Sequence, residues 1–221
     1  MAVVIGATTT NTTATTRSNT DPLEPSGIGA GDGALVLLHV EDDVSVTKDG
    51  AGWTLLFQVD HASRPMDFYC WYNPNADGAD FGTTHASSWS QAAALEVSGH
   101  NTDGSIDPAT ASTNTGTSTT PSASSITTLI ANTFLCAGYE AWESGSSFAT
   151  YSSPITENID VGQFSVASGE QVSAGASGAK TCTATFGGGG AQEWATGMFG
   201  VPIVAAGVTT RRYSMPLTGL G

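Results

Sequence analysis

The sequence has little charge, few basic residues, few cysteines and no long apolar run. Charged residues make up 12% of the 221 residues, and Thr, Ser and 27 Gly stand where Lys and Glu are usual. Helical bundles and coiled coils are excluded, because they need charged and apolar residues at helical spacing. Thr beside β-branched apolar residues suits a pleated, half-buried surface, and Gly allows turns with positive φ. The composition therefore predicts an all-β domain.

Basic residues are the scarcest charged type. Lys and Arg number 6 against 20 Asp and Glu, which gives a net charge of −14, and no Lys or Arg lies between Arg64 and Lys180. Such a surface repels nucleic acid and anionic membranes, so neither is expected as a partner. No apolar run approaches the roughly 20 residues that span a bilayer. The acidity favours solubility, with cation binding in acidic loops as the alternative.

Cysteine and export signals are also scarce. Cys70, Cys136 and Cys182 each lie in or beside an apolar segment, and an odd number leaves at least one unpaired. Because of these apolar segments we expect buried free thiols, with a disulfide as the alternative, and no spacing suggests zinc. Residues 1–8 lack the charged region and apolar core of a secretory signal, so folding is expected in a reducing cytoplasm. A surface-type composition without an export signal is typical of a virion protein, assembled in the host cytoplasm and released by lysis.

Apolar runs bounded by Gly, Pro, Asn and Asp predict about ten strands. Residues 34–40 are expected to form the first core strand and residues 66–72 a central one. The turn at 48–52, with its Asp-Gly step, predicts a hairpin that joins 44–47 to 53–60. Further strands are expected at residues 88–97, 126–130, 134–142, 159–166, 181–186 and 192–205.

The domain organisation follows from these strands. The polar, low-complexity residues 102–125 are expected to be a surface connection, because neither half of the chain is predicted to close a core alone. Residues 21–206 then form one antiparallel β-sandwich of jelly-roll type. Residues 1–20 are a Thr-rich arm or edge strand, and residues 207–221 are a tail.

The arm and the tail are predicted attachment devices. The tail holds Arg211 and Arg212, the only adjacent basic pair, followed by Tyr213. We expect the tail to dock on a neighbouring subunit, and the arm to add a strand to an exposed sheet edge. A merely unstructured tail is the alternative.

Six segments follow one another along nearly the whole chain. They are Pro25-Ser-Gly-Ile-Gly-Ala-Gly-Asp-Gly-Ala-Leu, Gly52-Trp-Thr-Leu-Leu-Phe-Gln, Tyr69-Cys-Trp-Tyr, Ser88-Trp89, Pro121 with Thr128-Leu-Ile, and Ser168-Gly to Gly175-Ala-Ser-Gly-Ala-Lys-Thr-Cys-Thr-Ala-Thr. In this order they resemble a jelly-roll domain of tailed-phage structural proteins and some bacterial surface proteins. The resemblance implies a non-enzymatic module placed as a decoration, collar, fibre or adhesin component, and it supplies no catalytic residues.

Three functions are therefore weighed. The first is a phage virion structural protein that contacts capsid, collar or tail proteins and forms a homo-oligomer. The second is a carbohydrate-binding domain that recognises host surface glycans, for which Trp89 and Trp142 are the candidate contacts because they lie near predicted loops. The third is a glycan-degrading enzyme. Glu140 and Glu143 flank Trp142 and are its candidate acids, with exposed, non-catalytic carboxylates as the alternative.

Calcium is the one cofactor that the acidic loops suggest. Asp42 and Asp43 form one candidate site and Asp103 with Asp107 another, although neither has the spacing of an EF-hand loop. The turn at residues 77–80 is a weaker candidate, and solvated carboxylates are the alternative throughout. The four histidines are scattered and are expected to have no special role.

Overall fold

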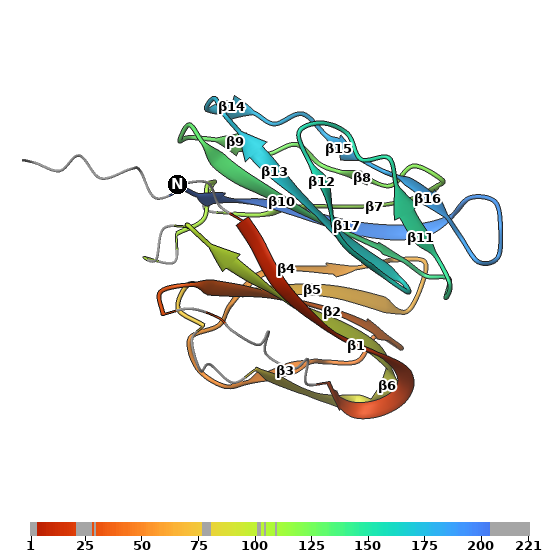
Figure 1. Ribbon diagram of the computed structural model, residues 1–221. Coiled ribbons are helices and arrows are strands. Elements are labelled where there is room, and N and C mark those ends of the chain that lie inside the picture. The colour runs from red at the N-terminus through yellow and green to blue at the C-terminus, as the bar shows by residue number, and fades with distance from the viewer. Residues whose placement is uncertain are drawn as a thin grey trace, which may run out of the picture.

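The computed structural model is an antiparallel β-sandwich, which confirms the all-β expectation (Figure 1). It describes residues 4–20, 28, 30–76, 81–100, 103, 105–108 and 110–203, with the backbone alone for residues 4 and 7–20. The first sheet has the order β1-β6-β2-β5-β4, with β3 paired to β6. Its strands are β1 (Val4–Thr20), β2 (Gly33–Glu41), β3 (Thr47–Asp49), β4 (Thr54–Asp60), β5 (Met66–Asn73) and β6 (Gly82–Ser98).

The second sheet has the order β12-β13-β10-β17-β7, and three two-stranded ribbons accompany it. Its strands are β7 (Ser112–Ser118), β10 (Thr133–Ala141), β12 (Thr156–Val161), β13 (Phe164–Gln171) and β17 (Gln192–Pro202). The ribbons pair β8 (Ser122–Ala123) with β15 (Lys180–Thr181), β9 (Thr127–Thr128) with β14 (Gly175–Ala176), and β11 (Ser147–Ala149) with β16 (Thr183–Thr185).

The predicted core strands are present, and both faces of β2 are buried. Leu35 and Leu37 point into the core between the two sheets, while Val36 and Leu38 point to the outer face of the first sheet. This explains why residues 34–40 form a continuous apolar run rather than an alternating one. β5 is likewise buried at every position and lies inside the sheet, between β2 and β4.

The central core draws on both halves of the chain, as expected. Leu37 and Phe68 come from the first sheet, and Phe164 and Phe199 come from the second. Gly138 on β10 allows the sheets to approach, because a Cβ there would lie 2.9 Å from the Phe68 ring and 3.0 Å from Leu37. The sheets therefore form one packed unit, and neither would cover its inner face alone.

A second cluster covers the outer face of the second sheet. Tyr139 and Phe148 pack there with Cys182, and the small ribbons lie over them. Cys70 and Cys136 are buried in the central core, and all three thiols are free, as predicted. Burial raises the pKa of each thiol, so they behave as small apolar side chains.

The connectivity is that of a β-sandwich whose two sheets are built one after the other, and the jelly-roll type stays a prediction. Strands β1 to β6 build the first sheet, and every strand of the second sheet comes later in the chain. Each sheet thus comes from one half of the chain, although the two halves share the core.

Three local predictions are wrong. Residues 47–49 pair with β6 rather than with β4, so the Asp-Gly turn does not make the expected hairpin. Residues 159–166 are not one strand, because Gly162 and Gln163 turn the chain between β12 and β13. Residues 102–125 are not only a connection, because β7 pairs with β17 at the sheet edge, where a strand needs few apolar residues.

The predicted arm is an edge strand of its own domain. β1 pairs along its length with β6, with register shifts between Ile5 and Thr8, Asn11 and Thr15, and Arg17 and Asn19. This resolves the choice between an edge strand and an arm lying on a neighbour. The β6-facing side of β1 is occupied within the chain.

Candidate functional site

A histidine and a carboxylate face each other inside the sandwich, at the end where β2 and β10 finish. His39 on β2 and Glu140 on β10 are both fully buried. The His39 Nδ1 atom and the Glu140 Oε1 atom form a hydrogen-bonded ion pair that joins the two sheets. Glu41 lies on the other side of the imidazole, with its Oε1 atom 3.8 Å from His39 Nε2.

The burial of this pair sets its proton affinity. Burial lowers the pKa of His39, but the carboxylates of Glu140 and Glu41 together outweigh that effect and raise the pKa to about 9. Burial raises the pKa of Glu140, and the His39 charge opposes this. His39 therefore carries its proton at neutral pH, and the two charges neutralise each other in a region of low dielectric.

Two glutamines extend the contact beside the ion pair. Gln91, the neighbour of His39 on β6, accepts a 3.2 Å hydrogen bond from the backbone N–H of Gln163. Gln163 Nε2 in turn donates to the Trp142 carbonyl at 2.6 Å. We call His39, Gln91, Glu140 and Gln163 the polar clamp, because they join the ends of the two sheets and are all buried.

The polar clamp is incompletely satisfied by protein partners. His39 Nε2, Glu140 Oε2 and Gln163 Oε1 are buried and make no hydrogen bond within the protein. Each such atom has lost its hydration without a protein hydrogen bond in return. The polar clamp therefore sets the position of one sheet against the other, and its three unpaired buried atoms lower the stability of the fold.

The predicted glycan contacts, Trp89 and Trp142, lie at this same end of the sandwich. Both are half-buried, not fully exposed. Trp89 meets the His39 ring edge-on at a centroid distance of 5.1 Å. The guanidinium of Arg64 lies 5.3 Å from the centre of the Trp142 ring and also pairs with Glu193 at 3.3 Å. One face of Trp142 is therefore covered by an ion-paired cation.

A polar hollow of about 350 Å³ adjoins Arg64. Asp43, Asp60 and His61 line it together with Arg64, so its walls carry both hydrogen-bond donors and acceptors. A hollow of this kind suits a hydroxyl-rich ligand. From the sequence, Trp142 was singled out as a glycan contact and Asp43 only as a calcium ligand. Asp43 lies in the turn after β2, Asp60 ends β4, and His61 and Arg64 lie in the turn between β4 and β5.

The predicted acid pair, Glu140 and Glu143, is not arranged for glycoside hydrolysis. Glu140 is fully buried against His39, so the alternative of an exposed carboxylate is wrong as well. Glu143 lies half-buried in the turn after β10. A catalytic acid must reach the glycosidic oxygen, and the Glu140 carboxylate is enclosed by protein.

The two predicted calcium sites, Asp42 with Asp43 and Asp103 with Asp107, differ in their surroundings. Asp42 and Asp43 are exposed in a turn with positive φ, and the Asp42 N–H donates to the Pro65 carbonyl at 2.7 Å. Asp103 is exposed and accepts a 2.8 Å hydrogen bond from the Ser105 N–H. In the part of the chain that the structure describes, no three His, Cys, Asp or Glu residues form a metal-binding group.

Asp107, the fourth candidate, has a structural role instead. Its carboxylate is buried and accepts hydrogen bonds from the N–H groups of Leu129 and Ile130, at 2.8 Å each. The Thr133 hydroxyl donates to the same carboxylate at 3.0 Å. Asp107 therefore holds the 129–132 loop in place.

Replacing Asp107 by Asn is expected to lower the free energy of unfolding by about 2 kcal/mol, because charged acceptors make the stronger hydrogen bonds. Urea unfolding would measure the change. Asp43→Asn is the matched control, since Asp43 is exposed and Asn tolerates its φ of 48°. Equal stability of the two variants would contradict a structural role for Asp107.

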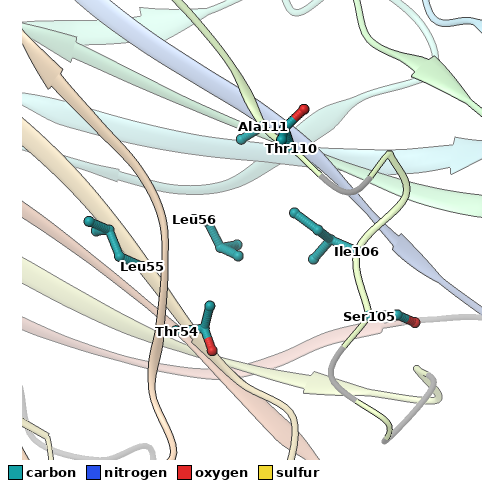
Figure 2. A pocket seen from close by; sticks show the side chains of 7 residues that line it. All are labelled: Thr54, Leu55, Leu56, Ser105, Ile106, Thr110 and Ala111. Carbon is teal, nitrogen blue, oxygen red and sulfur yellow. The ribbon is translucent and has the colours of Figure 1, made fainter.

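A cleft of about 480 Å³ lies beside the start of β4 (Figure 2). It is at the opposite end of the sandwich from the polar clamp, because Thr54 and Leu35 both pair with Tyr72, near the start of β2. Leu55 and Leu56 on β4 form one side, and Ile106 and Ala111 form the other. Hydroxyl groups of Thr54, Ser105 and Thr110 complete the lining, which holds no titratable side chain. The cleft therefore suits an apolar contact and offers no acid–base chemistry.

The remaining candidates include residues outside the described part of the chain. Arg211, Arg212 and Tyr213 lie there, as does the turn at residues 77–80. Of the other tryptophans, Trp71 and Trp194 are buried, whereas Trp53 is half-buried on the outer face of the first sheet.

His39 is the functional-site residue that the sequence reasoning missed. All four histidines are buried, although no special role was expected for them. The available signal was local: His39 interrupts the apolar run of β2, and Glu140 stands between Tyr139 and Ala141. A polar residue inside a fully buried strand needs a partner, which sequence alone does not identify.

Among the described residues, no helix is long and apolar enough to cross a membrane. No family model, no curated protein and no solved structure matches the chain.

Proposed function

We propose that this protein is a non-enzymatic structural component of a bacteriophage particle, displayed on the head, collar or tail. The observation that carries the proposal is an acidic, lysine-poor sandwich with three free, buried thiols. Free thiols fit a chain that folds in a reducing host cytoplasm. A Thr- and Ser-rich surface of net charge −14 fits exposure outside the cell, because it resists non-specific binding. A virion protein meets both conditions, because it folds in the host cytoplasm and lysis then releases it from the cell.

The sequence resemblance to jelly-roll virion domains supports the same proposal. In this role the sandwich provides a rigid body, and the tail with Arg211, Arg212 and Tyr213 provides attachment to a neighbouring virion protein. The partners are other virion proteins, together with further copies of this chain.

Deleting residues 207–221 is expected to abolish incorporation into particles and to leave the sandwich folded. Tagged full-length and truncated chains would be produced during infection, and mass spectrometry of purified particles would count the copies. Circular dichroism of the truncated chain is the folding control. Full-length chain missing from particles would overturn the proposed function. Normal incorporation of the truncated chain would overturn only the role of the tail.

A second candidate function is recognition of a host surface glycan. The polar hollow at Asp43, Asp60, His61 and Arg64 favours it, because it lies beside the half-buried Trp142. A glycan array with the purified chain separates the two functions. Specific binding that Arg64→Ala weakens would support recognition, and a blank array would leave the structural role.

A further inference from the structure

Large hydrophobic side chains are exposed mainly at one end of the sandwich. Among the described residues, Leu129 is 77% exposed, Val172 67%, Ile130 51% and Leu55 46%. Single exposed apolar residues are common, but a group of them marks an interaction surface. Whether these four residues lie close together therefore decides whether they mark an interaction surface.

Leu129, Ile130 and Val172 lie together. The loop at 129–132 joins β9 to β10, and the Asn132 N–H donates to the Val172 carbonyl at 3.2 Å. β10 begins there opposite the end of β17, where Thr133 pairs with Pro202. The described chain finishes at this end, because Ile203 forms a bridge with His100. Figure 1 shows the start of β1, the end of β17 and the β9–β14 ribbon gathered at this end.

The cleft of Figure 2 continues this surface. Asp107 binds the loop that carries Leu129 and Ile130, and its N–H donates to the Gly200 carbonyl at 2.8 Å. The preceding residue, Ile106, lines the same cleft as Leu55. We call Leu55, Ile106, Leu129, Ile130 and Val172 the terminal face.

The terminal face is held in shape before any partner binds. The buried Asp107 carboxylate fixes the backbone of Leu129 and Ile130, so these side chains are presented by an ordered loop. A loop that is already ordered loses less conformational entropy when a partner binds, so association is more favourable. A loop that only connected two strands would not need a buried carboxylate to expose two large apolar residues.

We propose that the terminal face is a self-association surface, covered by a second copy of this chain. Charge complementarity favours a copy as the occupant. Two chains of net charge −14 repel each other, but the only adjacent basic pair, Arg211 and Arg212, follows Ile203 in the sequence, which leaves the rest of each chain more acidic still. Glu170, on the neighbouring strand β13, is exposed at this same end.

The length of the chain beyond Ile203 allows the contact. Residues 204–221 lie outside the described part, and a chain of that length spans at most about 60 Å when extended. Each tail can therefore cross to the acidic body of the other copy while the two terminal faces meet. Such an arrangement is two-fold symmetric, with the same surface used on both sides.

Sedimentation equilibrium of the purified full-length chain tests the inference. The wild type is expected to associate at micromolar concentration, above the 22.4 kDa of one chain. The double variant Leu129→Asp with Ile130→Asp is expected to raise the dissociation constant roughly tenfold or more, because it places charge in an apolar contact. Arg211→Ser with Arg212→Ser is expected to weaken association mainly at low salt.

Ala62→Asp is the matched control. Ala62 is exposed in the turn between β4 and β5, so the variant adds charge at the other end of the sandwich. Circular dichroism would confirm that each variant folds. A monomeric wild type, or equal association of the 129/130 variant and the control, would overturn the inference. This measurement needs no particles, so a monomer that still enters virions would leave the proposed function standing.

Discussion

Replacing Glu140 by Leu is expected to lower the free energy of unfolding by about 3–5 kcal/mol, because it removes the fully buried carboxylate that His39 is hydrogen-bonded to and leaves the more exposed Glu41 near its charge. Leu is close to Glu in volume, so the loss reports the broken ion pair rather than a new cavity. Both side chains are fully buried and face each other across the two sheets. Urea unfolding of the wild type and the variant measures the difference.

The double variant His39→Leu with Glu140→Leu is the control for this prediction. It is expected to recover most of the lost stability, since two apolar side chains of suitable volume often replace a buried ion pair without loss. The double variant also removes His39 Nε2 and Glu140 Oε2, two buried atoms that make no hydrogen bond within the protein. Removing them favours recovery further, because an unpaired buried polar atom lowers stability. If the double variant is no more stable than Glu140→Leu alone, the His39 charge left without Glu140 is not the cause of the lost stability.

Raising the pH from 6.5 to 9 is expected to lower the free energy of unfolding by roughly 3 kcal/mol through His39 alone. The pKa of His39 is about 9 in the folded chain, against its ordinary 6.5. Below pH 6.5 both states hold the proton, so the stabilisation is fully present. Between the two values only the folded state holds it, and the stabilisation is lost as the pH rises through 9.

Urea unfolding at pH 6, 7, 8 and 9 would measure this dependence. The His39→Leu, Glu140→Leu double variant lacks both groups and is expected to lose most of the slope. Burial raises the pKa values of the cysteine thiols and of several tyrosines, whose ordinary values already lie near or above 9, so they act at higher pH. Parallel pH profiles for the two proteins would contradict the assigned role of His39.

The candidate site was only partly predictable, for a reason that the polar clamp makes clear. Trp142 and Glu140 were singled out from the sequence because an aromatic side chain stands beside acids. Their surroundings were not predictable, because the partner of Glu140 lies 101 residues away on another sheet. Sequence patterns report the face of a strand, but they do not report which residue lies opposite across the core.

The same limit explains the errors in strand pairing. The Asp-Gly step at residues 49–50 is a turn, and Gly50 has the positive φ that such a turn favours. Yet β3, which leads into this turn, pairs with Thr83 and Thr84 of β6 rather than with the strand that follows the turn. Local conformation was predicted, whereas the pairing was decided by the free edges that distant strands present.

The sequence by itself determined the all-β class, the buried strands β2 and β5 and the free, buried thiols. These follow from composition and short apolar runs, because burial of a strand depends on its own side chains. The tertiary structure alone decided the division of the sheets by chain halves, the pairing of His39 with Glu140, and the grouping of Leu129, Ile130 and Val172. Those features depend on contacts between residues far apart in the chain, which form only when both sheets close over one core.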